Sequence, residues 1–138
     1  MTVDYIIAGV GSWGAATLLF DNSAGDANEK FTPSFRDQVY ATPGYGAANN
    51  TKVPMGNTQA TVPFKWNSVY ASYDAAADAH RALRAVLKGK RVHLRVTQGA
   101  TINYYPNATL ESSGADVHGM TVDHSATFLS DDVTSTAP

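Results

Sequence analysis

The sequence predicts a mainly β, α+β fold: an antiparallel β-sandwich or barrel flanked by one α-helix at about residues 72–88. Two changes in hydrophobic period support this fold class. Apolar residues alternate with polar ones before residue 69 and again after residue 90, and between these stretches they recur at helical spacing. The third observation is a Gly/Asn-rich stretch at about 41–58, which we expect to be a long loop. A chain of 138 residues, 43% of them hydrophobic, should form a single domain, 1–138.

The first expected strand is residues 2–8, TVDYIIA, because β-branched and aromatic residues dominate it. Residues 21–58 are rich in turn-forming types and are expected to be a long loop region. Within it, ATPGYGAANNTKVPMGN holds three glycines, two prolines and three asparagines in 17 residues. From Thr58 the chain alternates again, and Pro63 indicates an edge strand or the end of a strand.

The strongest helix signal runs from Ser72 to Lys88, without an internal Gly or Pro. Ser72 is a suitable N-cap, and Gly89 stands where a left-handed C-terminal residue is favoured. Acidic residues lie near the start and basic residues near the end, the order that complements the helix dipole. The expected apolar face consists of Ala76, Ala79, Leu83, Val86 and Leu87.

Three further strands should follow as an antiparallel meander. They are RVHLRVT after the helix, residues 101–111 with a bulge or break around Pro106, and a strand within GMTVDHSATF. We expect a turn at 112–116 and a flexible C-terminal tail at 130–138. One face of the last strand should carry Met120, Val122, His124, Ala126 and Phe128.

Charge and composition exclude several classes of function. Ten basic and twelve acidic side chains give a formal charge of −2, so we expect no specific nucleic-acid recognition. The absence of cysteine removes disulfides, thiolate metal sites and cysteine nucleophiles. The longest apolar runs are too short for a transmembrane helix, so we expect no membrane partner.

The stretch GVGSWG, Gly9 to Gly14, fits the dinucleotide-binding pattern G-x-G-x-x-G. That fingerprint works only between a strand and a helix, with a second parallel strand ending in an acid about 20 residues on. Glu29 has this spacing, but the residues around it lack strand character. We therefore interpret Gly9–Gly14 as a Gly-rich bend, followed by a short apolar segment that packs on the core, and we expect no bound cofactor.

The histidines offer the remaining candidate chemistry. His118 and His124, with Asp116 and Asp123, could belong to a metal site, but an extended strand would separate the two histidines by about 20 Å at ~3.3 Å per residue unless it is sharply bent at Gly119. We expect no metal and no catalytic residues. His80 should lie at the boundary of the helix's apolar face. The basic residues Arg81, Arg84, Lys88, Lys90, Arg91 and Arg95 should form a solvated or subunit-contact surface.

After residue 60, the order of the expected elements and their pattern of polar and apolar residues resemble those of a known protein family. AHRALRAVLKGKRVHLRV, followed by strands that end in MTVDHSATFLSDD, resembles the β-sandwich-plus-helix domain of tail-tube and distal-tail proteins of tailed bacteriophages. The resemblance covers roughly residues 60–132. It implies a non-enzymatic virion protein, assembled in the host cytoplasm, whose partners are copies of itself in rings or stacked rings and other virion proteins.

This resemblance gives the 41–58 segment a role. We expect the segment to be disordered in an isolated subunit and to become ordered against a partner, because it has few side chains that can bury surface. Two other readings stay open: a head-tail connector, tail terminator or decoration protein, and a small metal-dependent hydrolase or ligand-binding β-sandwich using His118, Asp123 or His124. The residues expected to contact other subunits are Tyr45, Asn49, Asn50, Val53 and Met55.

Overall fold

A computed structural model describes residues 1–22, 30–43 and 50–138, without the side chains of residues 42, 43, 50 and 51. The elements, in chain order, are β1 (Thr2–Ile7), the short 3-10 helix η1 (Trp13–Ala15), β2 (Thr17–Asp21), β3 (Ser34–Pro43), β4 (Asn50–Val69), α1 (Tyr73–Leu87), β5 (Arg91–Gln98), β6 (Thr101–His118) and β7 (Thr121–Ser130). The predicted mainly β fold with one α-helix is confirmed.

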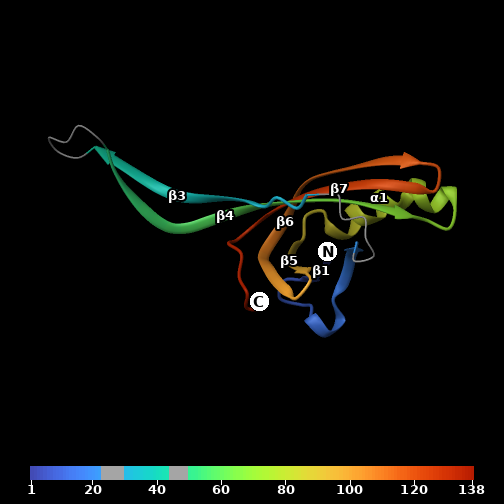
Figure 1. The fold of residues 1–138 in the computed structure, drawn as a ribbon, viewed down its shortest axis with the longest axis horizontal. Coiled ribbons are helices and arrows are strands. Elements are labelled where there is room, and N and C mark those ends of the chain that lie inside the picture. Colours follow the sequence, from blue (N-terminus) through green and yellow to red (C-terminus); the bar gives the residue numbers. More distant parts are fainter. Residues whose placement is uncertain (23–29, 44–49) are drawn as a thin grey trace.

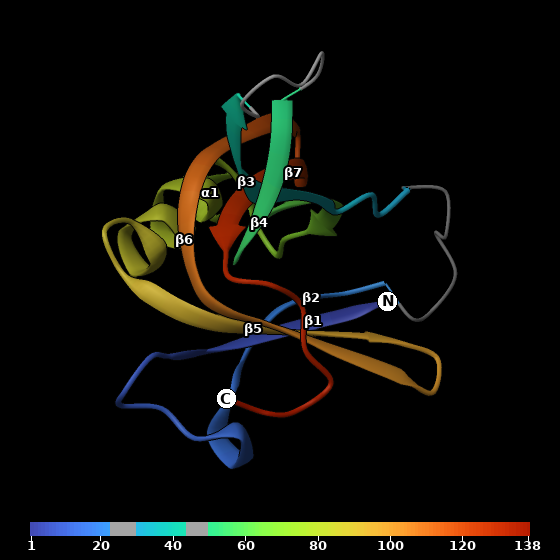
Figure 2. The ribbon, with the colours of Figure 1, turned by 90° about the vertical axis from the view of Figure 1, so that its left-hand side faces the viewer.

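The strands form one seven-stranded antiparallel sheet in the order β2-β1-β5-β6-β7-β4-β3. Figure 2 shows the long β6 curving from the half that contains β1, β2 and β5 to the half that contains β7, β4 and β3. The sheet therefore folds over on itself, and its two halves face each other as in a sandwich. The meander β5-β6-β7 that the sequence predicts is present.

The core lies between the two halves of the folded sheet. Phe64 of β4 contacts the ring of Phe20 from β2 at 5.7 Å between centroids and the ring of Phe128 from β7 at 5.9 Å. Phe31 stacks on Phe64, with ring centroids 5.3 Å apart and the planes nearly parallel. These contacts join both ends of the sheet order, because alternate residues of every strand point to the same inner side.

Helix α1 packs against β6 and β7. The Ser72 hydroxyl accepts a hydrogen bond from the backbone N–H of Ala75, as expected of an N-cap. Ala76 and Leu87 are buried, but Val86, predicted to face the core, is 47% exposed. The helix is rotated so that His80, predicted to lie at the boundary, faces the sheet instead.

The turn predicted at 112–116 is wrong, because these residues continue β6. A register shift between Leu110 and Ser112 carries the strand on, and the turn comes at Gly119, whose φ is +62°. The tail predicted to be flexible is attached to the body at several points. The backbones of Thr134 and Tyr104 exchange two hydrogen bonds of 2.8 and 3.0 Å, the Asp131 N–H donates to the Pro106 carbonyl at 2.9 Å, and the Trp13 indole N–H donates to the Pro138 carbonyl at 3.2 Å.

The loop predicted at 41–58 is also wrong for the described residues. Residues 41–43 end β3 and residues 50–58 begin β4, and the two strands pair from Ser34↔Thr61 to Pro43↔Asn50. Cross-strand pairing overrides the turn-forming composition, which acts only locally. Pro63 does mark an edge, because β4 beyond Thr61 pairs with β7 alone among the described strands.

Candidate functional site

The most distinctive feature of the molecule is a long two-stranded arm, formed by residues 34–43 of β3 and 50–59 of β4. Figure 1 shows the arm extending well away from the body. The β4–β7 ladder begins at Ala60, so the arm has no third strand among the described residues. Both of its faces and both of its backbone edges are therefore available to another molecule.

A β-bulge bends the arm near its middle. The pairing jumps from Asp37↔Thr58 to Val39↔Pro54, which leaves Gln38 opposite a longer segment of β4. Gly56, within this segment, has a φ of +76°, a conformation that other residues adopt at a cost. The bulge therefore favours glycine at this position, where most other residues would be strained.

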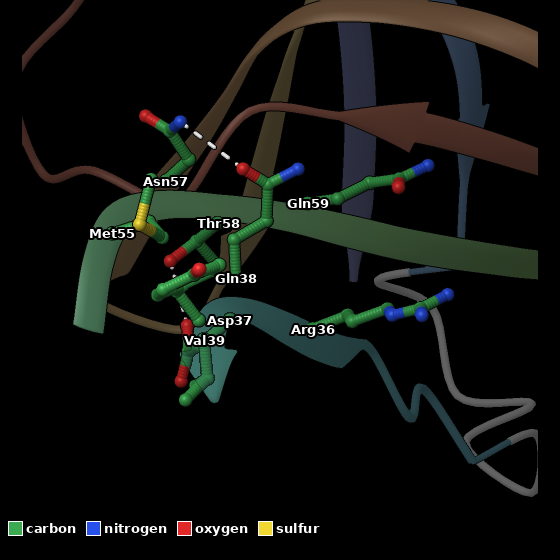
Figure 3. A pocket seen from close by; sticks show the side chains of 9 residues that line it. Arg36, Asp37, Gln38, Val39, Met55, Asn57, Thr58 and Gln59 are labelled. Atoms are coloured by element: carbon green, nitrogen blue, oxygen red, sulfur yellow. Dashed lines mark hydrogen bonds between the residues drawn. The ribbon is translucent and has the colours of Figure 1, made fainter. Parts of the chain in front are cut away.

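Polar side chains hold the bulge together. The Asn57 side-chain amide donates to the side-chain oxygen Oε1 of Gln38 at 3.2 Å, and the Thr58 hydroxyl donates to the Asp37 carboxylate at 2.6 Å. Figure 3 shows these cross-strand pairs beside the exposed side chain of Met55. A hollow of about 700 Å³ opens here, lined by Arg36–Tyr40, Met55 and Asn57–Gln59.

Large apolar side chains line the arm at the bulge and beyond it. Val39, Tyr40 and Met55 are 52%, 59% and 54% exposed. An apolar group that is solvated to this extent gains about 25 cal/mol for each Å² that a partner covers. The arm can therefore supply hydrophobic contact area, with polar groups around the hollow to orient it.

The structure places two of the predicted subunit-contact residues, Val53 and Met55, exposed on this arm. Tyr45 and Asn49 lie outside the described residues, as does the side chain of Asn50. The sequence reading missed Phe35, Val39 and Tyr40, although their aromatic and β-branched character favours a strand. Ser34 to Tyr40 could have been read as the first strand of a hairpin on that ground.

The Gly9–Gly14 stretch forms the bend between β1 and β2. These two strands are antiparallel, with Val3 opposite Phe20, whereas the dinucleotide fingerprint needs a helix and then a parallel strand. A side chain on Gly11 would come within 2.8 Å of the Ile6 Cβ atom, so glycine here permits a tight return of the chain. The interpretation as a bend before an apolar segment is confirmed, since Leu19 and Phe20 are buried.

His118 and Asp123 come together because the chain is sharply bent at Gly119, but His124 does not join them. The β6–β7 turn folds the chain back, and His118 Nε2 lies 3.3 Å from Asp116 and 3.5 Å from Asp123. Their ligand atoms lie within 4.8 Å of one another, a spacing that could hold a metal ion. All three side chains are exposed, whereas catalytic sites are usually concave. His124 points to the opposite face.

His124 is buried and contacts the helix. Its Nδ1 lies 3.1 Å from Nδ1 of His80 on α1, and its Nε2 lies 2.8 Å from the Tyr70 hydroxyl. Burial lowers the pKa of both histidines; Arg84 lowers that of His80 further, and His80 lowers that of His124 against an opposing effect of Asp123. The arrangement favours neutral imidazoles and offers no nucleophile.

Three of the six basic residues predicted to form one surface have separate partners. Arg81 pairs with Asp78 on the exposed side of α1, and Arg84 donates to the Ser113 hydroxyl at 2.6 Å. Arg95 binds Asp4 and lies over the Trp13 ring, 4.9 Å from its centroid. This dispersal leaves no continuous groove of free cations among these three residues.

A comparison with solved structures finds a chain with a similar fold. The chain superposes on a chain of the six-fold symmetrised cryo-EM structure of the anti-feeding prophage (AFP) baseplate. The TM-score is 0.53, the sequence identity is 8%, and the match covers 96% of this chain and 89% of the other. No protein-family model and no curated protein sequence matches the chain.

At this level of identity the similarity establishes the fold. It extends over 96% of the chain, and therefore beyond residues 60–132, to which the sequence resemblance is confined. Among the described residues, no helix combines the length and apolar character needed to cross a bilayer.

Proposed function

We propose that this protein is a structural subunit of a phage-tail-type virion assembly, in which copies pack side by side in a ring and the arm holds a neighbouring copy. The observation that carries the proposal is the exposed β3–β4 arm. The fold similarity to a chain of a prophage baseplate supports the same class of assembly. The proposed role is assembly, without catalytic turnover.

The arm has the physical character of an interaction element. A two-stranded ribbon is marginally stable by itself in water, because it has no core of its own. Covering Val39, Tyr40 and Met55 would bury apolar surface, and the free backbone edges could pair with another strand. A second molecule can therefore supply the contacts that the ribbon lacks.

The sheet topology favours contacts between unlike surfaces of successive copies. One end of the sheet is β2 and the other is β3, so the two edges differ in sequence and shape. Head-to-tail contacts between unlike surfaces generate rings when the rotation closes. This supports a ring, and the arm, which reaches beyond the body, suits contact with the adjacent copy or the next ring.

Within this class we favour a tail-tube or distal-tail subunit, on the resemblance of residues 60–132. A connector, a tail terminator and a decoration protein would use the same fold in other positions of the virion. All these readings share the partners proposed: copies of the chain and other virion proteins, without specific nucleic-acid recognition and without a membrane.

The test is an arm-shortened variant, in which residues 37–58 are replaced by Asn-Gly. Arg36 and Gln59 are directly paired, so a two-residue turn can join them. The wild type should form rings or tubes at rising concentration, in sedimentation velocity and negative-stain microscopy, and the variant should stay monomeric. Its melting temperature should stay near that of the wild type, because the residues removed lie outside the core.

Point variants test the exposed side chains of the arm while keeping its length unchanged. Tyr40→Ser with Met55→Ser should weaken assembly, whereas Val69→Ser, at an exposed position at the far end of β4, should leave assembly unchanged. Assembly of the arm-shortened variant at wild-type concentrations would refute the role of the arm. A wild type that stays monomeric up to millimolar concentration would refute the assembly itself.

A further inference from the structure

Helix α1 is joined to the sheet by a direct contact between two histidine rings. His80 lies in the middle of α1, and His124 lies on β7 at the inner face of the sheet. The rings stack with centroids 5.4 Å apart and planes 27° apart. Their Nδ1 atoms are 3.1 Å apart, a distance at which the N–H of one ring donates a hydrogen bond to the nitrogen of the other.

The surroundings leave these rings few polar contacts. His124 is 3% exposed and stacks on the other side against Trp66 of β4, at 5.0 Å between centroids. Its Nε2 lies beside the Tyr70 hydroxyl, whereas Nε2 of His80 is buried without a hydrogen-bond partner among the described residues. Buried polar atoms are nearly always paired, so an unpaired imidazole nitrogen at a helix–sheet interface calls for an account.

The geometry accommodates neutral rings and resists protonation. A neutral pair shares one proton across the Nδ1–Nδ1 contact. A proton added to His80 would put a charge on a ring whose Nε2 has no partner. Protonation of both rings would set two N–H groups against each other at 3.1 Å, which removes the hydrogen bond and adds repulsion between two cations.

The charged groups around the pair are few. Arg84, one turn along α1, opposes a charge on His80, and Asp123, beside His124 in sequence, favours a charge on that ring. Asp123 points to the other face of the sheet, where it contacts His118. From β6, the residue opposite His124 is Ala115, and Arg84 is bound to Ser113, so the inner face supplies no carboxylate at these positions.

We propose that the His80–His124 contact is an acid-sensitive latch, which holds α1 on the sheet at neutral pH and releases it when the rings take up protons. The direction follows from proton binding. A released helix exposes both imidazoles, which then bind protons with an ordinary pKa of about 6.5, whereas the docked rings bind them less readily. Docking is therefore at full strength above about pH 6.5 and weakens as the pH falls below it. The latch is independent of the proposed assembly.

Backbone hydrogen exchange of the full chain tests the latch. After correction for the intrinsic rate, protection of the α1 amides should fall between pH 7.5 and pH 5.0 by about threefold to thirtyfold, thirtyfold being the ceiling for one histidine with an exposed pKa near 6.5. The amides of β5 should lose less protection than those of α1. An equal loss in β5 would show global unfolding and would overturn the latch.

Three variants assign the effect to the two rings. His80→Gln and His124→Gln should each reduce the pH dependence of α1 exchange. His118→Gln changes an exposed histidine on the neighbouring strand and should leave it as in the wild type. Wild-type dependence in both His80→Gln and His124→Gln would overturn the proposal.

A pH titration of the wild-type protein by NMR tests the latch without depending on whether a variant folds. The ring protons of His80 and His124, followed by NMR, should titrate below the ordinary histidine pKa of about 6.5. The two midpoints should also be coupled, because the rings touch. Midpoints of both rings at or above about 6.5 would overturn the proposal.

Discussion

Asp4 and Arg95 form the most enclosed ion pair among the described residues. Their side chains are 13% and 26% exposed, and Arg95 Nε donates to the Asp4 carboxylate at 2.9 Å while a second guanidinium nitrogen binds the other carboxylate oxygen. These hydrogen bonds raise the pKa of Arg95, and they join β1 to β5 at a directly paired position. A bidentate contact of this kind is among the stronger polar interactions in proteins.

We expect Arg95→Ala to lower the free energy of unfolding by about 2 kcal/mol, because it leaves the Asp4 carboxylate without its partner and removes the contact with Trp13. The matched control is Arg81→Ala, which breaks an exposed pair with Asp78 and should cost less than about 0.5 kcal/mol. Urea unfolding at pH 7 measures both. Equal losses in the two variants would contradict the special role of the enclosed pair.

At the scale of the element, α1 begins and ends where short-range signals place it. Ser72 caps the first turn, and Gly89 follows the helix with a φ of +74°. The face that the helix buries is decided by its packing on β6 and β7, which brings His80 inward and leaves Val86 exposed. In the arm too, local and distant effects act at different places. The bend depends locally on the conformation of Gly56, whereas the strands depend on pairing with each other.

Ser72→Ala should destabilise the protein by about 1 kcal/mol, because the N–H of Ala75 loses its acceptor. Ser72→Asp should retain most of the stability, since a carboxylate can accept the same hydrogen bond and also favours the helix N-terminus. Thermal unfolding followed by circular dichroism compares the three proteins. A loss in Ser72→Asp as large as in Ser72→Ala would count against the cap.

For the whole molecule, stability depends on the contact between the two halves of the folded sheet. Phe64 is central to it, because its ring is 1% exposed and touches Phe20, Phe31 and Phe128. The arm, by contrast, carries its large apolar residues in solvent. The molecule therefore separates a body that folds around a core from an extension available for contact.

Phe64→Ala should cost about 3–5 kcal/mol, since it removes a buried ring and leaves a cavity between the halves. This is a large part of the 5–15 kcal/mol that a domain typically has. Phe35→Ala, a change of the same size on the 46%-exposed arm residue, should cost less than about 1 kcal/mol. Chemical denaturation of both variants measures the difference, and similar costs would refute the separation of body and arm.

Most of the arm could not be predicted from the sequence. Val53 and Met55 were expected at a contact surface and are exposed on the arm, but their segment was assigned to a loop. Gly, Asn and Pro indicate turns through local conformational preference, and this preference yielded to a long ladder of cross-strand hydrogen bonds. The three residues that the reading missed, Phe35, Val39 and Tyr40, lie in the partner strand of that ladder.

The sequence by itself determined the class of fold, the helix between Ser72 and Lys88, the meander after it and the buried face of β7 that includes Val122 and Phe128. These depend on periodicity and caps, which involve residues within a few positions of one another. Only the tertiary structure decided the arm, the curve of β6, the meeting of His118 with Asp123 and the contact of His80 with His124. Each of these depends on register or packing between segments distant in the chain, and a one-residue shift in register exchanges the two faces of a strand.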